Sequence, residues 1–215
     1  MKLKRASAFI VSIIMLISVT GCGNNTESNA KTELNAKEEV SIDFDMHSTG
    51  SVLQFGTFEG EPINWIVLNK QFDKALLMTE EPLTSKPFHS ETSRATWENS
   101  TIRTWLNDDF YNSAFSEAEK NLIRETQNTS IINSHRFMSN NQEKTISTTE
   151  KVFLLSEDEV SSYQTYMKET AFCWIRDTST FDGCIIDYST LFKVYDKDVE
   201  ESHGICPAIW VDVKK

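Results

Sequence analysis

The chain has 215 residues, with 32 acidic against 21 basic side chains and a formal net charge of −11 at pH 7. A protein this acidic is a poor candidate for binding nucleic acid or anionic lipid through its folded part, because both ligands carry negative charge. The length suits one globular domain with shorter accessory segments.

The N-terminus has the pattern of a secretory signal. Residues 1–5 carry three basic side chains, and the apolar run over residues 8–19 is shorter than the ~20 residues that a membrane-spanning helix needs. The run ends in Val19-Thr20-Gly21-Cys22, which resembles the lipobox of bacterial lipoproteins. The resemblance implies a signal peptide over residues 1–21 and lipidation of Cys22, which would anchor the protein in the lipid bilayer. The alternative is an ordinary secretory signal with a coincidental cysteine.

Residues 22–50 are polar, mixed in charge and almost free of large apolar side chains. Such a composition cannot offset the entropy lost on ordering, so we expect a flexible tether. Cleavage before Cys22 would remove three basic residues and change the formal charge from −11 to −11 − 3 = −14. We therefore expect a lipid-anchored protein on the extracytoplasmic face of the cell membrane, with residues 51–215 as its globular domain.

The stretch over residues 97–115 predicts the short helix around which the domain is organised. Its apolar side chains recur at i, i+3, i+4 and i+8, namely Ile102, Trp105, Leu106 and Phe110. Asn99 or Ser100 precedes them as an N-cap. A helix this short is not stable alone, so its aromatic face must pack against the rest of the domain.

The remaining pattern indicates an α+β fold with mostly antiparallel sheets and two or three short flanking helices. The predicted strands are 52–58, 63–68, 74–79, 152–155, 171–176, 183–187 and 204–212. Pro207 marks the start of the last strand, or a bulge in it, and capping boxes at Ser116 and Ser156 predict two further helices. We expect a loop around Pro82 and Pro87, and a long surface loop over the Asn-, Ser- and Thr-rich residues 126–149.

An ordered set of motifs from residue 52 to the C-terminus resembles the DUF6273 family of bacterial domains. The matching pieces are Phe55-Gly56, Asn64-Trp-Ile-Val-Leu68, Ala75-Leu-Leu77, Thr96-Trp-Glu-Asn-Ser-Thr-Ile-Arg-Thr-Trp-Leu-Asn107, Phe110-Tyr111, Phe115-Ser-Glu-Ala-Glu119, Lys151-Val-Phe-Leu-Leu-Ser156, Trp174-Ile-Arg176 and Pro207-Ala-Ile-Trp210. The layout is also similar to the C-type-lectin-like superfold of sulfatase-modifying-factor domains, an analogy of fold that carries little functional weight. This chain has Cys206 where the family has an arginine before the last strand.

Beyond Cys22 the chain has three cysteines, an odd number for an oxidising compartment. Our leading interpretation is a disulfide between Cys173 and Cys206, in strands expected to be adjacent, with Cys184 as a buried free thiol. One alternative is three inert buried thiols. Another is a closed zinc site in which His203 joins the three cysteines. Its ligand types fit, but the cysteines do not have the close spacing of a zinc knuckle. We expect no metal and no cofactor.

Trp174 and Arg176 are the candidate ligand-binding residues. Together they could stack against, and bind in a bidentate manner, a carboxylate or a sugar. In the alternative interpretation, Arg176 is the structural ion-pair partner of an acid such as Glu98 or Asp187. The acidic run over residues 196–201 could hold calcium, but it lacks the glycine and spacing of an EF-hand loop, and a solvated loop is the simpler interpretation.

The sequence contains no recognisable catalytic motif. Its seven glycines form no phosphate-binding loop, and neither Gly-x-Ser-x-Gly nor His-Glu-x-x-His occurs. The favoured hypothesis is therefore a membrane-anchored lipoprotein whose domain, without catalysis of its own, binds a cell-surface glycan or a protein partner. The alternatives are an envelope-acting enzyme with Cys184 or Cys206 as an activated thiol, and a purely structural lipoprotein with a partner interface on residues 126–149.

Overall fold

The computed structural model describes residues 42–43, 46–91, 95–133, 143–168, 172–179, 183–187 and 193–213. All of them belong to one compact unit, Glu38–Lys215. The predicted signal peptide and Cys22 lie outside the described residues, as does most of the predicted tether. None of the described helices is long and apolar enough to cross a membrane.

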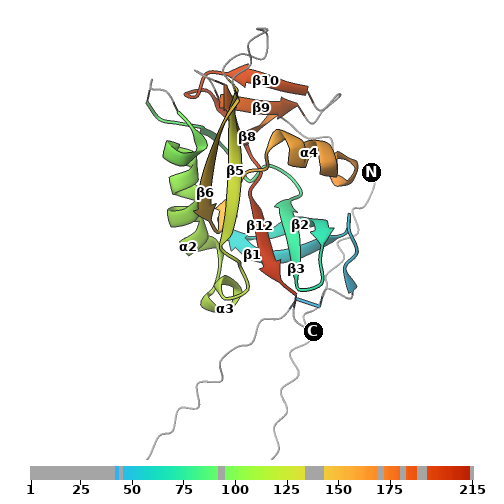
Figure 1. Ribbon diagram of the computed structural model, residues 1–215. Helices are drawn as coiled ribbons and strands as arrows, with labels where there is room; N and C mark the ends of the chain where they lie inside the picture. The colour runs from blue at the N-terminus through green and yellow to red at the C-terminus, as the bar shows by residue number, and fades with distance from the viewer. Residues whose placement is uncertain are drawn as a thin grey trace, which may run out of the picture. The chain divides into compact units, whose positions relative to one another are not determined.

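The first sheet combines the N-terminal strands with the C-terminal one. It has the order β1-β2-β3-β12-β7, and its pairings are antiparallel (Figure 1). The strands are β1 Val52–Phe58, β2 Glu61–Lys70, β3 Lys74–Thr79, β7 Val152–Phe153 and β12 Ala208–Asp212. The predicted meander over residues 52–79 is confirmed. Glu59 and Gly60 join β1 to β2 with φ values of 52° and 89°, as a type I′ hairpin turn requires.

The second sheet has the order β10-β9-β8-β11-β4, with β5 paired to β8 and β6 paired to β5. Strand β8 runs parallel to β5 and β11, and the other pairings are antiparallel. The strands are β4 Thr84–Pro87, β5 Thr126–Asn133, β6 Glu143–Glu150, β8 Phe172–Ser179, β9 Gly183–Asp187, β10 Lys193–Lys197 and β11 Ser202–Ile205.

The predicted central helix is present as one continuous helix segment, residues 101–114. It consists of α1 Thr101–Trp105, a π-helical turn η3 Leu106–Phe110 and α2 Tyr111–Ala114, preceded by the 3₁₀ turn η2 Trp97–Asn99. Ser100 is the N-cap, and its hydroxyl accepts a hydrogen bond from the backbone N–H of Arg103.

The two predicted capping boxes are also confirmed. Ser116 opens α3 and Ser156 opens α4, and in each box the serine hydroxyl accepts from the N3 backbone while the N3 glutamate accepts from the serine backbone. The helices are α3 Glu117–Lys120 and α4 Glu157–Tyr163, the latter followed by the 3₁₀ turn η4 Gln164–Tyr166. The α+β class, with mostly antiparallel sheets and short helices, is therefore confirmed.

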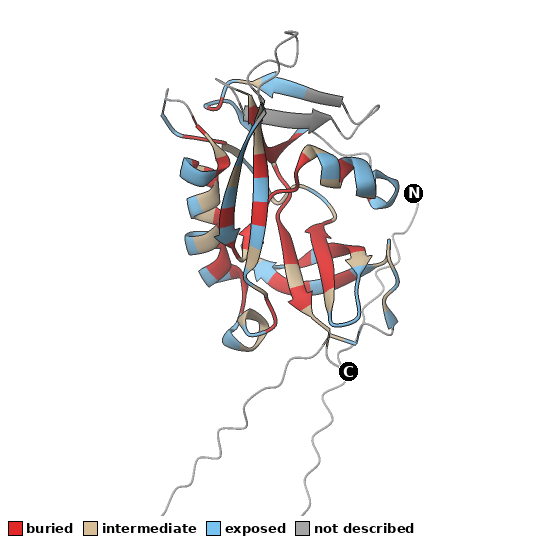
Figure 2. Ribbon diagram, viewed as in Figure 1, coloured by how far each residue is buried: buried red, intermediate tan, exposed pale blue. Residues whose placement is uncertain are grey.

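The prediction of a surface loop over residues 126–149 is wrong. Strands β5 and β6 form an antiparallel hairpin there, paired from Thr126 and Glu150 to Asn133 and Glu143; residues 134–142 lie outside the described part. Buried and exposed positions alternate along β5 (Figure 2). The buried positions carry polar side chains, namely Asn128, Ser130, Thr148 and Glu150. The hairpin therefore lacks the apolar alternation by which a half-buried strand is recognised.

Two further strands lie where none was predicted. Strand β4 occupies part of the expected proline-bounded loop; it is an edge strand that pairs with β11, which is the position where a sheet tolerates proline. Strand β10 pairs with β9 and includes the start of the acidic run that was expected to be a loop.

The predicted final strand over residues 204–212 is divided at Cys206 and Pro207, as the proline indicated. Strand β11 belongs to the second sheet and β12 to the first, so these two residues carry the chain from one sheet to the other. Pro207 has no N–H to give to a ladder. Its carbonyl accepts from the backbone N–H of Thr79 at 3.0 Å, which starts the pairing with β3.

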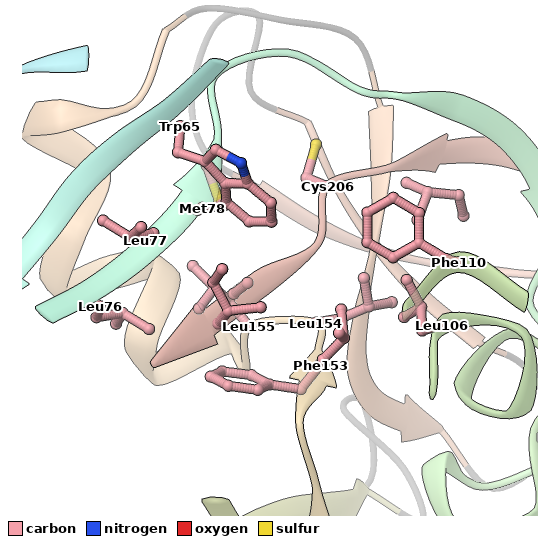
Figure 3. Packing of buried hydrophobic residues seen from close by; sticks show 14 of the residues in the cluster. Trp65, Leu76, Leu77, Met78, Leu106, Phe110, Phe153, Leu154, Leu155 and Cys206 are labelled. Atoms are coloured by element: carbon pink, nitrogen blue, oxygen red, sulfur yellow. The ribbon is translucent and has the colours of Figure 1, made fainter. Parts of the chain in front are cut away.

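The helix segment packs against the aromatic side chains of the first sheet. The ring centre of Phe58 in β1 lies 5.8 Å from that of Phe110 and 6.3 Å from that of Trp105. The ring centres of Phe55 and Phe115 are 5.3 Å apart. In Figure 3, Leu106 and Phe110 point into the same interior as the side chains of β3 and β7. Full burial of such a side chain stabilises the fold by roughly 1.5–3 kcal/mol. The aromatic face predicted for this helix is thus its contact with the sheet.

Gly56 sets the distance between β1 and the end of the helix segment. Its φ is +70°, and a Cβ atom there would lie 2.8 Å from the carbonyl oxygen of Ala114 and 2.7 Å from the ring of Phe115. The Gly56 N–H donates to Glu119 Oε1 at 2.9 Å. A bulge in β1 between Gln54 and Thr57 permits this close approach.

Replacing Gly56 by alanine should therefore lower the free energy of unfolding by about 3 kcal/mol or more, because steric overlap adds to the unfavourable positive φ. Gly60→Ala is the matched control: its φ is +89°, but no atom lies within 4 Å of the added Cβ, so about 1 kcal/mol is expected. Urea denaturation of the two variants measures both values. Equal losses would contradict the proposed close packing at Gly56.

Candidate functional site

A polar groove of about 420 Å³ lies between the helix segment and the junction of β6 with β7. Arg103, Asn107 and Tyr111 come from the helix segment, and Glu150 and Lys151 come from the junction. The rim of the groove consists of further polar residues, Thr104, Asp108, Asn112, Glu125 and Thr149. These ten residues together form the groove.

The floor of the groove is a buried carboxylate. The side chain of Glu150 is 1% exposed. Its Oε1 accepts hydrogen bonds from Trp97 Nε1 at 3.0 Å, Asn128 Nδ2 at 2.9 Å and Thr148 Oγ1 at 3.1 Å. Its Oε2 accepts from Arg103 Nε at 3.0 Å. A buried charge is tolerated when it is paired and its oxygens are hydrogen-bonded, and both conditions are met here.

Arg103 is held in one orientation by three partners. Besides Glu150, its guanidinium donates to the carbonyl oxygens of Glu98 at 3.3 Å and Thr149 at 3.2 Å. The arginine side chain remains 25% exposed, so part of it borders the groove. Because the planar guanidinium is already oriented, the Arg103 side chain would lose little conformational entropy when a ligand binds to it.

Asn107, in the π-helical turn, fastens the helix segment to β7. Its Nδ2 donates to the carbonyl oxygens of Arg103 at 3.0 Å and Val152 at 2.8 Å. Its Oδ1 accepts from the backbone N–H groups of Lys151 at 3.0 Å and Val152 at 3.1 Å. The amide therefore completes the hydrogen bonding of β7, which is an edge strand of the first sheet.

Tyr111 and Lys151 form the end of the groove. Lys151 Nζ donates to the Tyr111 hydroxyl at 2.9 Å and lies 4.7 Å from the centre of its ring. Lys120 lies 5.6 Å from the same ring. These cation–π contacts help to fix the position of the Tyr111 ring, which is buried.

The rim differs from the floor in having unused hydrogen-bonding groups. Asp108, Asn112 and Glu125 are exposed, and within the described part of the chain their side chains make no hydrogen bond. Two basic and three acidic side chains line the groove, so its formal charge is 2 − 3 = −1. The groove is thus a nearly neutral surface rich in both donors and acceptors.

A second groove, of about 410 Å³, is lined by four acidic side chains and several apolar ones. The acidic residues are Glu59, Glu61, Glu80 and Glu81. Glu80 is paired with Lys168 at 2.7 Å.

The structure places the predicted ligand-binding pair inside the protein. Trp174 is 1% exposed and Arg176 is 4% exposed, because every position of β8 from residue 173 to 178 is buried. The indole N–H of Trp174 donates to the backbone carbonyl of Lys86 at 2.8 Å. The expected stacking corner for a ligand is therefore not presented to solvent in this structure.

Arg176 instead makes contacts within the fold. Its Nε donates to the carbonyl of Thr129 and its Nη1 to that of Leu154, both at 2.9 Å, and it forms an ion pair with Glu159. The geometry supports the alternative interpretation of a structural ion pair. The acid is Glu159 of α4, not Glu98 or Asp187 as expected, because α4 packs against β8.

Asp177 is a buried acid that the sequence reasoning missed. It is 5% exposed, and its carboxylate accepts from the backbone N–H groups of Ile131 at 2.7 Å and Glu157 at 2.8 Å. It thereby joins β5 to the first turn of α4. Burial raises the pKa of this carboxyl above its usual value, and the two backbone hydrogen bonds oppose that shift.

Cys173 and Cys206 are neighbours in the interior. Their Sγ atoms lie 2.8 Å apart, and both residues are buried. The hydrogen bond between the thiols and then burial raise the pKa of Cys173. The Cys206 side chain is itself only 5% exposed, so a substrate has little access to it and the position is poorly suited to the activated Cys206 nucleophile of the enzyme hypothesis. The side chain of Cys184 lies outside the described part.

Among the described residues, no three His, Cys, Asp or Glu side chains are placed to hold a metal ion. The ring of His203 instead lies edge-on against Trp174, with 4.9 Å between ring centres, and contacts Glu201 at 3.1 Å. That contact lowers the pKa of Glu201. The described part of the chain therefore offers no geometry for the zinc and calcium alternatives.

Comparison with known proteins identifies a family. The profile described as "Domain of unknown function (DUF6273)" matches residues 72–183, just over half of the chain. No curated protein and no solved structure matches the chain. All residues of the groove fall within the matched stretch.

The Glu150 carboxylate gives a direct test of how the groove is held. In Glu150→Gln, the amide NH2 group would face a donor in either orientation, and the Arg103 guanidinium would lose its charge partner. We therefore expect a loss of about 3 kcal/mol in unfolding free energy. Glu125→Gln is the matched control on the exposed rim and should change stability by less than about 0.5 kcal/mol. Urea denaturation measures both values. A loss in Glu150→Gln as small as in the control would contradict the account of the groove floor.

Proposed function

The chain belongs to the DUF6273 family, and from this premise we propose that it is a lipid-anchored extracytoplasmic lipoprotein whose domain binds a neutral, hydroxyl-rich cell-surface glycan in the groove. The domain acts in this proposal by binding alone, without catalysis. Its lipid partner is the bilayer, reached through acylated Cys22.

The observation that carries the binding proposal is the arrangement of fixed and unused polar groups in the groove. Arg103, Asn107 and Lys151 are each oriented by hydrogen bonds to the protein, whereas Asp108 and Asn112 on the rim are exposed. A surface oriented before binding loses little entropy when a ligand arrives. This arrangement suits recognition of an external polar molecule.

The charge of the groove selects the class of ligand. Sugar hydroxyls both donate and accept, and so match the carboxylates of Asp108 and Glu125, the amide of Asn112 and the ammonium of Lys151. The formal charge of −1 in the groove and of −11 over the chain opposes polyanionic polymers. A neutral glycan is therefore favoured over an anionic one.

The anchor rests on the lipobox-like run ending at Cys22. Attachment of two or more acyl chains gives stable membrane binding, where one chain would be marginal. The tether expected from the composition of residues 22–50 would hold the domain on the order of 30 Å from the bilayer. The groove could then reach glycans near the membrane surface.

The proposed relation to the C-type-lectin-like superfold is one of fold alone. In its support, strand β12 near the C-terminus joins the N-terminal meander β1–β3 in one sheet. Because one fold can host many functions, this relation adds no weight to the choice of ligand.

The groove is tested with the double variant Asp108→Asn/Asn112→Ala. On an array of neutral and anionic cell-surface glycans, the full chain should bind neutral glycans, and the double variant should bind them at least about tenfold more weakly, which corresponds to ~1.4 kcal/mol. Asp158→Asn/Ser162→Ala is the matched control, because it changes an acid and a small polar residue four positions apart at exposed positions of α4. Preferential binding of anionic glycans, or equal losses in both variants, would contradict the proposal.

The anchor is tested with Cys22→Ser. Wild-type protein should sediment with membranes after cell lysis, and the variant should move to the soluble fraction because no acyl chain can be attached. Cys184→Ser serves as the control and should remain in the membrane fraction. If the Cys22→Ser variant still sediments with membranes, the proposal of a lipid anchor at Cys22 is wrong.

A further inference from the structure

The passage of the chain between the two sheets lies directly against β8. Cys206 follows β11 of the second sheet and precedes β12 of the first. Its Sγ lies 2.8 Å from that of Cys173 in β8, and Figure 3 shows Cys206 within the interior of the domain. The two cysteines are 0% and 5% exposed, so the pair is shielded from water.

We propose that Cys173 and Cys206 form a disulfide in the exported protein, and that this bond joins the two sheets covalently. The inference does not depend on the proposed ligand. A protein disulfide has an S–S distance of about 2.05 Å, so the sulfur atoms need to approach each other by only about 0.8 Å. Side-chain rotations of this size do not require a change in the strands.

The backbone at this point is arranged for close approach. Gly204 of β11 pairs in parallel with Cys173 of β8. A Cβ atom at Gly204 would lie 2.9 Å from Cys173 Sγ and 2.9 Å from the carbonyl oxygen of Phe172. The absence of a side chain at Gly204 therefore leaves room for the sulfur of Cys173 beside β11.

The register of the sheet favours Cys206 over Cys184 as the partner of Cys173. Cys173 is paired with Ile186 of β9, so Cys184 occupies the diagonal position two residues away. Diagonal neighbours in antiparallel strands are about 7–8 Å apart, whereas Cα atoms of disulfide-bonded cysteines are usually ~4.4–6.8 Å apart. Cys184 is therefore the cysteine left as a thiol.

The oxidation is a two-electron dithiol–disulfide exchange. The thiols of Cys173 and Cys206 give up two protons and two electrons as the S–S bond forms, and a disulfide of an extracytoplasmic thiol oxidase takes them up and becomes two thiols. The compartment implied by the proposed export supports such an oxidant. After folding, burial protects the bond from reductants.

The bond would hold the strand that supports the groove. Strand β12, which begins two residues after Cys206, pairs with β7, and β7 is fastened to the helix segment by Asn107. The bond closes a loop between residues 33 apart, which restricts the unfolded chain. It therefore stabilises the junction of both sheets.

The state of the cysteines is read from the exported protein, isolated from its cells without reductant. The protein is denatured in iodoacetamide, digested and mapped by mass spectrometry without reduction. We expect the peptides of Cys173 and Cys206 as one cross-linked species, two hydrogens lighter than the sum of the reduced peptides, with Cys184 alkylated. Alkylation of both Cys173 and Cys206, or a cross-link that contains Cys184, would overturn the proposal.

The stabilising effect is measured separately. Refolding the protein in dithiothreitol should lower the Tm by roughly 5–15 °C. Cys184→Ala is the matched control and should keep this response, whereas Cys173→Ala/Cys206→Ala should lose it. If the double variant does not fold, the peptide map of wild-type protein still decides whether the bond exists. A Tm of wild-type protein that is unchanged by reduction would show that the bond does not join the sheets as proposed.

Discussion

The buried carboxylate of Glu150 is the interaction on which the arrangement around the groove depends. It gathers hydrogen bonds from Trp97 in η2, Arg103 in α1 and Asn128 in the β5–β6 hairpin. Trp97 and Arg103 lie on adjacent elements, whereas Asn128 comes from a hairpin further along the chain. A buried charge is costly unless each oxygen is satisfied, so the carboxylate specifies where its donors must lie.

A second constraint is that the two sheets share one interior. The chain crosses from the second sheet to the first at Cys206 and Pro207, and β12 then pairs with both β3 and β7. Asn107 ties the helix segment to β7 at the same place. The groove is consequently built on a junction whose parts restrain one another, and this explains how a polar surface can be held rigid by short helices and an edge strand.

Local sequence patterns predicted those elements whose boundaries are set by residues only a few positions apart. The N-cap at Ser100, the capping boxes at Ser116 and Ser156 and the break at Pro207 were all recognisable, because caps and prolines act on the adjacent backbone. The β5–β6 hairpin was missed because its inward face is polar. Arg176 illustrates the same limit, since its identity indicated an ion pair but its spacing gave the wrong acid; Glu159 is brought to it by the packing of α4.

The sequence by itself determined the α+β class, the meander, the aromatic helix and the family to which the chain belongs, and it marked Cys22 as the expected lipidation site. Periodicity and capping are local, so they can be read from one chain. Only the tertiary structure decided which polar residues are buried and which remain available. Arg103 and Glu150 are 47 positions apart, and Cys173 and Cys206 are 33 apart. Such pairs depend on how strands and helices pack across the interior, and no local pattern specifies that arrangement.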